Sequence, residues 1–146
     1  MTATRWFPES MPVPAVTADT LGWWEAAAEH RLVVQACSGC GRTRHPPSPM
    51  CPACRGRSSS WKEVPGTGSI YTFTVVHQAF LPDLAERVPY VVAVVDLDEG
   101  GGARLVTNIV DAAPAEVVIG GRVGVVWEDM GPELAVPRAR LLAGNG

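Results

Sequence analysis

The C-terminal half of the chain is a succession of short segments rich in β-branched and aromatic residues, separated by turn-forming residues. Segments of this composition and length are typical of β-strands. The glycines within residues 99–102 indicate a hairpin, and Pro137 predicts that the last strand is an edge strand or a bulged one. We expect strands at residues 69–77, 90–97, 103–110, 122–128 and 134–141.

Five strands without a long helix predict a small barrel, closed or partly open, and a mainly β chain. The five-stranded OB-fold is the commonest barrel of this size, so we assign residues 65–146 to an OB-fold. Tyr71, Phe73 and Trp127 occupy alternate strand positions, where most aromatic side chains are expected in the core and one or two on a ligand-binding face.

Residues 1–35 have a different pattern, with a proline-containing arm followed by a helix. The prolines of residues 1–16 favour an extended arm, and its apolar side chains indicate packing on this domain or on a partner. Residues 17–30 are alanine-rich with apolar positions at helical spacing, which predicts a helix. Either both of its tryptophans are core residues or one of them faces a partner. The aromatic residues that we expect at a partner interface are Trp6, Phe7, Trp23 and Trp24.

Two C-x₂-C knuckles, Cys37–Cys40 and Cys51–Cys54, are separated by ten residues. Each knuckle lets two sulfur atoms face one ion, and two knuckles complete a tetrahedral site. Glycines beside the first knuckle allow backbone amides to turn towards the thiolates. We therefore predict a rubredoxin-like zinc ribbon at residues 36–64, with a structural Zn²⁺ ion bound by Cys37, Cys40, Cys51 and Cys54.

A site of four thiolates has no open coordination position, so it is predicted to stabilise the fold rather than to activate water. His45 lies between the knuckles as an alternative ligand, and iron is an alternative metal for the same ligands. Two disulfides would require an oxidising compartment, which nothing in the sequence indicates. No nucleophile, base and oxyanion hole can be assembled, so we expect no catalytic residue.

Charge is unevenly distributed along the 146 residues, whose formal net charge is −3. Residues 31–62 contain six basic and no acidic residues, whereas residues 65–146 contain five basic and ten acidic residues. The acidic half counts against a general nucleic-acid binder, which spreads basic charge along its binding face. No segment resembles a membrane span or a signal peptide, so we expect a cytoplasmic protein without a membrane partner.

In their order along the chain, these features resemble the zinc-ribbon/OB-fold acyl-CoA-associated proteins, a family long described as a domain of unknown function. The cysteine pattern alone is shared with many zinc ribbons, but the ordered combination is much more specific and extends nearly from end to end. The matching features are the Trp23-Trp24 helix, both knuckles with Gly41, Pro46 and Pro47, Trp61, Gly66-Thr-Gly68, Tyr71-Thr-Phe73-Thr74, Pro89-Tyr90, Gly120 and Val136-Pro137-Arg138.

The resemblance implies a non-catalytic accessory subunit that binds a thiolase-like enzyme, such as a ketothiolase or a steroid side-chain aldolase, or a hydratase. The subunit would help to bind or channel the acyl-CoA thioester. Basic side chains suit the coenzyme A phosphates, and those expected to bind acyl-CoA are Arg42, Arg44, Arg55 and Arg57. One alternative is a nucleic-acid-binding module, since zinc ribbons and OB-folds both occur in that role. Another is an independent enzyme or a rubredoxin-like electron carrier.

Overall fold

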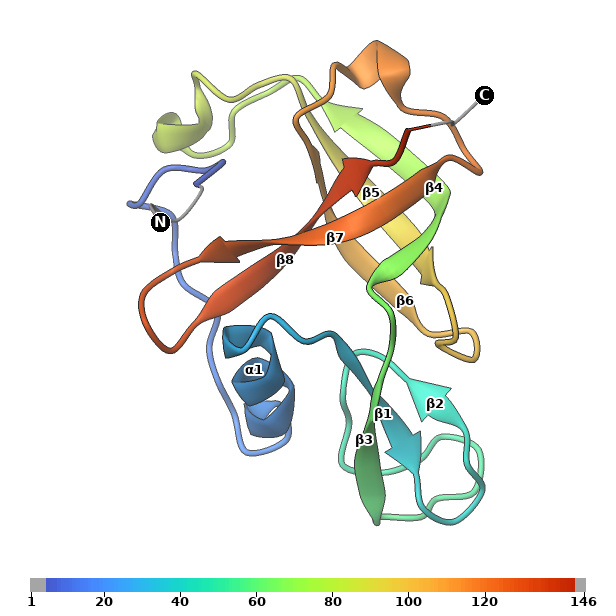
Figure 1. Ribbon diagram of the computed structural model, residues 1–146. Coiled ribbons are helices and arrows are strands. Elements are labelled where there is room, and N and C mark those ends of the chain that lie inside the picture. The colour runs from blue at the N-terminus through green and yellow to red at the C-terminus, as the bar shows by residue number, and fades with distance from the viewer. Residues whose placement is uncertain (1–4, 144–146) are drawn as a thin grey trace.

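The computed structural model describes residues 5–143, in which an N-terminal arm, with a turn where the N–H of Met11 donates to the carbonyl of Pro8 at 3.1 Å, leads into helix α1 (Leu21–Ala28) (Figure 1). The helix begins four residues later than predicted because a turn precedes it, in which the N–H of Thr20 donates to the carbonyl of Thr17 at 3.1 Å. Within the described range, no helix has both the length and the apolar character needed to span a membrane. The side chains that α1 buries are those of Trp23, Ala26 and Ala27.

The ribbon is a three-stranded antiparallel sheet formed by β1 (Val33–Cys37), β2 (Thr43–Arg44) and β3 (Ser59–Glu63), with β1 in the centre. Strand β1 is almost entirely buried, whereas β3 is exposed along its whole length. A sheet of this size buries little apolar surface of its own. Its stability must therefore come from its contacts with the rest of the chain and from a cross-link between its loops.

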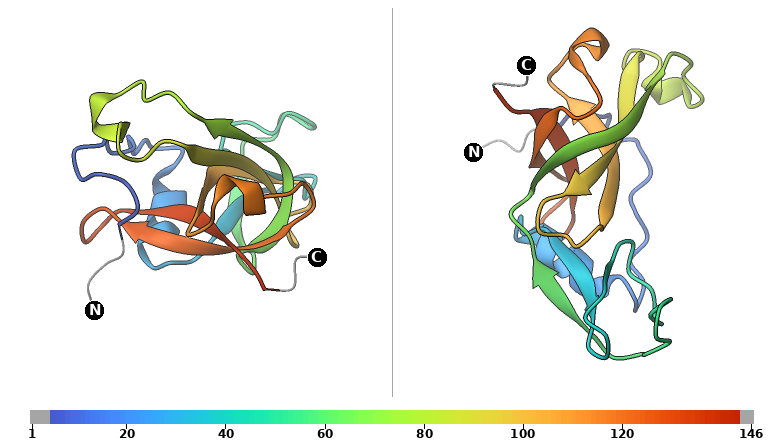
Figure 2. Two further views of the ribbon diagram at one scale, coloured as in Figure 1. Left: turned by 90° about the horizontal axis from the view of Figure 1, so that it is seen from above. Right: turned by 90° about the vertical axis from the view of Figure 1, so that its right-hand side faces the viewer.

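Five strands close into a barrel in the order β4-β5-β6-β8-β7 (Figures 1 and 2). Neighbouring strands are antiparallel except for β6 and β8, which are parallel. This arrangement is the five-stranded OB-fold, as predicted. The strands are β4 (Thr67–Val76), β5 (Tyr90–Leu97), β6 (Arg104–Val110), β7 (Arg122–Asp129) and β8 (Ala135–Leu141), with short 3₁₀ helices η1 (Pro82–Leu84) and η2 (Pro114–Glu116).

Two barrel positions differ from the sequence-based expectation. The register of β4 against β5 shifts after Ile70, and Tyr71 at this bulge points outwards and is 48% exposed. Pro137 lies within the closed barrel instead of on an edge strand. This is possible because β8 pairs with β6 only from Ala139 onwards, and the Pro137 carbonyl accepts a hydrogen bond from the Thr107 hydroxyl at 2.6 Å.

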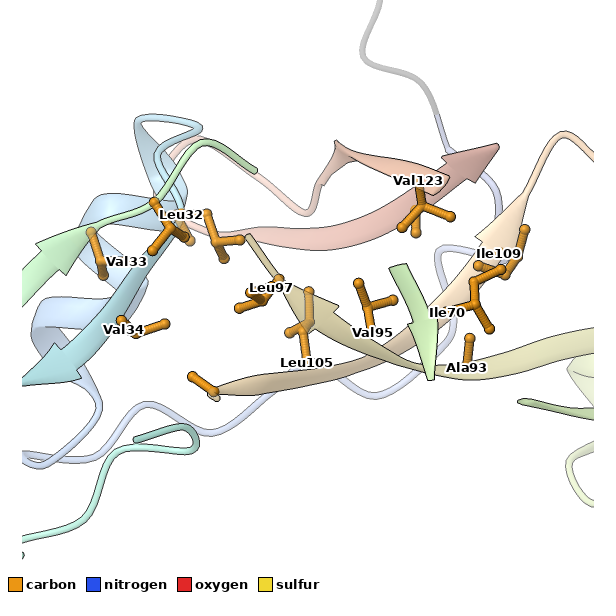
Figure 3. Packing of buried hydrophobic residues seen from close by; sticks show 14 of the residues in the cluster. Leu32, Val33, Val34, Ile70, Ala93, Val95, Leu97, Leu105, Ile109 and Val123 are labelled. Carbon is orange, nitrogen blue, oxygen red and sulfur yellow. The ribbon is translucent and has the colours of Figure 1, made fainter. Parts of the chain in front are cut away.

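A single apolar core extends from the barrel into the ribbon and the helix. Figure 3 shows Leu97 and Leu105, from the barrel hairpin, on the side that faces Leu32 and Val34 at the start of the ribbon. Full burial of a side chain of this kind contributes about 1.5–3 kcal/mol. The shared core therefore fixes the ribbon against the barrel.

The hairpin between β5 and β6 also binds the ribbon through hydrogen bonds. The Thr43 hydroxyl donates to the carbonyl of Gly100, and the Lys62 ammonium group donates to the carbonyl of Glu99 at 2.6 Å. At Gly101, where φ is +63°, a Cβ atom would lie 2.5 Å from the hydroxyl oxygen of Thr43. Glycine is thus required where the hairpin approaches the ribbon most closely.

Candidate metal centre and ligand surfaces

The four cysteine sulfur atoms converge at the end of β1 that points away from the barrel (Figure 1), and all lie within 4.8 Å of one another. The Sγ atoms of Cys37 and Cys54 are 3.5 Å apart, and those of Cys40 and Cys51 are 3.7 Å apart. A tetrahedral site with Zn–S bonds of about 2.3 Å has edges of about 3.8 Å. The donor atoms therefore fit a zinc ion, and none of the four cysteines forms a disulfide.

Backbone amides beside the sulfur atoms favour thiolate formation. The N–H groups of Cys40 and Gly39 lower the pKa of Cys37 to about 6. The N–H of Gly56 also lowers the pKa of Cys54, but the three neighbouring sulfur atoms outweigh it and raise this pKa to about 11. Four sulfur atoms this close can all be ionised only around a cation, because each thiolate disfavours the next.

The zinc site is closed to chemistry, because four thiolates fill a tetrahedral shell and leave no position for water or substrate. His45 lies outside the sulfur cluster. Its imidazole packs near Trp23, with the ring centres 5.5 Å apart, and burial lowers its pKa. The ligands are therefore the four cysteines, and the zinc ion stabilises the ribbon.

The structure divides the four arginines expected to bind coenzyme A into two groups. Arg42, Arg55 and Arg57 are exposed, and their side chains make no hydrogen bond or ion pair within residues 5–143. Arg44 is half-buried, and its guanidinium donates to the hydroxyl and the carbonyl of Ser48 at 3.0 and 2.9 Å. Arg44 thus holds the loop between the knuckles.

The N-terminal arm packs on the barrel of its own chain. The indole N–H of Trp6 donates to the carboxylate of Asp111 at 2.9 Å. The ring of Phe7 meets that of Tyr90 edge-on, with centres 5.9 Å apart. The backbone N–H groups of Trp6 and Phe7 both donate to the carboxylate of Glu128. Both aromatic side chains remain half-exposed.

The arm follows the face through which OB-folds commonly bind ligands. That face is formed by the second and third barrel strands, here β5 and β6, and by the loops after the first and fourth strands. Between the arm and this face lies a cleft of about 350 Å³, lined by Phe7, Met11 and Pro14 of the arm and by Leu84, Val92 and Met130 of the barrel.

A second cleft, of about 260 Å³, lies where the helix, the ribbon and the barrel meet. Both tryptophans of the helix line this cleft. Trp23 is buried, at 5% exposure, whereas Trp24 is half-buried. The two indole rings are in edge-on contact, with centres 4.7 Å apart. The other walls include His45, Pro46, Val106, Pro137 and Arg138. Sequence analysis missed this cleft because its walls come from three distant segments.

The fold and the metal site define a class of protein in which a rubredoxin-like ribbon, closed by four cysteines, is joined to an OB-fold barrel. Residues 24–59 match the family model described as the rubredoxin-like zinc ribbon domain of ChsH2, and residues 61–128 match that of its C-terminal OB-fold domain. The chain belongs to the ChsH2 family, which is related to proteins with a DUF35 domain.

Three similar proteins illustrate the range of the family. A chain of the Ltp2-ChsH2(DUF35) aldolase has a TM-score of 0.78 and 43% identity, covering 88% of this chain and 98% of its own. A DUF35 domain-containing scaffold protein of Methanocaldococcus jannaschii is 36% identical over 72% of this chain and 73% of its own length. A probable enoyl-CoA hydratase alpha subunit of Thermomonospora curvata is 44% identical over 86% of this chain, but this chain spans only 38% of that subunit.

Proposed function

We propose that the chain is a non-catalytic accessory subunit that binds an acyl-CoA-processing enzyme and helps to bind or channel its acyl-CoA substrate. The observation that carries this proposal is the similarity to a chain of the Ltp2-ChsH2(DUF35) aldolase, at 43% identity over 98% of that chain. The partner is a thiolase-like enzyme, either a ketothiolase or a steroid side-chain aldolase, or else a hydratase. Four cysteines that bind a metal ion rather than form disulfides favour a reducing compartment, the cytoplasm.

The exposed arginines supply a place for the phosphates of coenzyme A. Arg42, Arg55 and Arg57 belong to the segment without acidic residues, and no carboxylate of the described chain neutralises them. Guanidinium groups bind phosphate oxygens through charge-assisted hydrogen bonds. We assign phosphate binding to these three residues, and to Arg44 the positioning of the loop between the knuckles.

The half-exposed aromatic residues supply a place for the partner enzyme. Trp6, Phe7 and Trp24 each keep part of their surface accessible although they pack on this chain. Aromatic side chains are enriched at protein interfaces, where they contribute apolar contact area. In this proposal Trp23 acts indirectly, because it holds Trp24 in place.

A nucleic-acid-binding role is less consistent with the arrangement of the arm. An oligonucleotide would need the face of β5 and β6, and Phe7 and Met11 of the arm line the cleft against that face. The barrel half of the chain also carries twice as many acidic residues as basic ones, ten against five. Both features favour the accessory-subunit role.

Affinity purification of the full-length chain, followed by binding measurements on the purified complex, tests the proposal. We expect a thiolase-like enzyme or a hydratase to co-purify and the complex to bind acyl-CoA. Replacing Arg42, Arg55 and Arg57 together by Ser should weaken acyl-CoA binding about tenfold or more, because charge-assisted hydrogen bonds are lost. Arg87→Ser, which removes an exposed charge from the loop before β5, is the control. Absence of any such partner, or high-affinity single-stranded nucleic-acid binding instead, would reject the proposal.

A further inference from the structure

We infer that the cleft between helix α1, the ribbon and the barrel binds the pantetheine arm of the thioester, the neutral amide-bearing chain between the phosphates and the acyl group. This inference rests on the proposed function and assigns its ligand to a particular place. The cleft has a volume of about 260 Å³ and brings together residues from all three parts of the fold.

The walls of the cleft suit a narrow, apolar chain. Trp24 comes from the helix, Pro46 and Pro47 come from the ribbon, and Val106 comes from β6. Val106 is 65% exposed because it lies on the outward-facing side of β6. An apolar side chain that stays open to solvent beside an aromatic and proline-lined wall is typical of a small-molecule site.

The two ionisable side chains of the cleft leave it without net charge. Burial lowers the pKa of His45, so its imidazole is neutral at physiological pH. Arg138 donates to the buried carboxylate of Glu128 at 2.7 Å and to the side-chain oxygen of Asn108 at 2.8 Å. A neutral chain matches this environment, whereas phosphates match the unpaired arginines of the knuckles.

Two buried hydrogen-bond donors at the cleft have no partner among residues 5–143. They are the indole Nε1–H of Trp23 and the guanidinium Nε–H of Arg138, and both residues line the cleft. A buried donor left without an acceptor costs about 1–3 kcal/mol. The pantetheine arm carries two amide carbonyls, and because other atoms cover both donors, a carbonyl reaches them only when side chains of the cleft shift.

The cleft lies within reach of the predicted phosphate site. Arg42 immediately precedes β2, and His45 immediately follows it. Three residues of extended chain span about 10 Å, which is shorter than an extended pantetheine arm. A coenzyme A molecule with its phosphates at Arg42 is therefore long enough to place its amide chain at the cleft.

Titration of the zinc-loaded full-length chain with pantetheine, which has no phosphate group and no nucleotide, tests this inference by NMR of the indole N–H groups. The five tryptophans give five resolvable indole signals, assigned with single Trp→Phe variants. We expect the signals of Trp23 and Trp24 to shift, because a new acceptor reaches the cleft. The signals of Trp61 and Trp127, which do not line the cleft, should not move.

A matched pair of valine variants completes the test. Val106→Glu places a charge in the cleft and should weaken pantetheine binding by the chain, and acyl-CoA binding by the complex, about tenfold or more. Val118→Glu changes another exposed valine, 52% accessible, in the loop before β7, and should change neither affinity. Because both sites are exposed, both variants are expected to fold, with unfolding curves close to that of the wild type.

The outcomes separate this inference from the proposed function. If the two variants bind acyl-CoA equally well in the complex and pantetheine leaves the Trp23 signal unmoved, the cleft is not the site, although the accessory role stands. If no acyl-CoA binds to the wild-type complex at all, the proposed function fails together with the inference.

Discussion

The fully buried carboxylate of Glu128 accepts a hydrogen bond of 2.7 Å from the guanidinium of Arg138 beneath the N-terminal arm. The other oxygen of the same carboxylate accepts the N–H of Phe7 at 3.0 Å. Burial raises the pKa of Glu128, but Arg138 and the arm N–H groups outweigh this effect and lower it. One ionised carboxylate thus joins β7, β8 and the arm.

Replacing Glu128 by Ala should destabilise the protein strongly. The substitution leaves the Arg138 charge buried without its partner, and breaking a buried pair costs about 3–5 kcal/mol. Urea denaturation gives this change in the free energy of unfolding. As a control, Asp96→Ala breaks the exposed pair with Arg104 and should cost less than about 1 kcal/mol. Equal effects of the two substitutions would show that the buried pair does not hold the arm.

Asp98 gives the protein a pH-dependent contribution to stability. The Arg122 guanidinium, which donates to Asp98 at 3.0 Å, and the Thr67 hydroxyl lower the pKa of this carboxyl to about 2. An unfolded aspartate has a pKa of about 3.9, so the stabilisation is present above about pH 4 and disappears as the pH falls towards 2.

Asp98→Asn should therefore lower the free energy of unfolding at pH 7 but not near pH 2. The expected loss is about 1 kcal/mol or less, because both side chains of the pair are at least one-third exposed. Denaturation of the wild type and the variant across this pH range measures the difference. A difference that stays constant between pH 7 and pH 2 would mean that the charge of Asp98 is not its cause.

The barrel and the metal site were predictable from the sequence for physical reasons. A strand needs β-branched and aromatic residues between turns, and these mark the barrel strands directly. A closed thiolate site needs two tight knuckles, and the spacing of Cys37, Cys40, Cys51 and Cys54 supplies them.

The ligand surfaces were less predictable because tertiary contacts decide them. In an eight-residue helix that is apolar on several sides, periodicity does not determine which of Trp23 and Trp24 is buried. Arg44 resembles Arg42 in the sequence, yet its guanidinium is engaged by Ser48 and is therefore not available to a ligand as that of Arg42 is. The clefts form where the arm, helix α1 and the ribbon meet the barrel, which no local pattern encodes.

The contact between Gly22 and Trp61 holds α1 against β3. A Cβ atom at position 22 would lie 2.2 Å from the indole Nε1 of Trp61, so any larger residue must displace the ring. We expect Gly22→Ala to destabilise the protein by about 1 kcal/mol, because overpacking of about 1–3 kcal/mol exceeds the gain of about 1 kcal/mol in helix propensity.

A double-mutant cycle isolates this contact. In a Trp61→Ala background the collision is gone, and Gly22→Ala should stabilise the protein by about 0.5–1 kcal/mol through helix propensity alone. Thermal or urea denaturation of the four proteins measures both steps. If Gly22→Ala has the same effect in both backgrounds, the helix does not depend on this close approach.

Gly56 limits the space around the metal centre more tightly than Gly39 does. A Cβ atom at Gly56 would lie 3.2 Å from the Cys54 sulfur and 3.5 Å from that of Cys37, whereas one at Gly39 would lie 3.6 Å or more from any sulfur. The N–H of Gly56 also donates to Cys54 at 3.4 Å. A methyl group at position 56 must therefore shift a ligand or lengthen this hydrogen bond.

We expect Gly56→Ala to lower zinc affinity about tenfold or more, and Gly39→Ala to change it little, since altered surroundings of metal ligands typically cost about 10–100-fold. Competition with a coloured zinc chelator measures both affinities, starting from chains that hold one zinc ion each by metal analysis. Complete zinc removal should unfold the ribbon, because binding of this kind supplies on the order of 10 kcal/mol. Loss of zinc without loss of ribbon structure by circular dichroism, or equal affinities of the two variants, would contradict the structural role of the site.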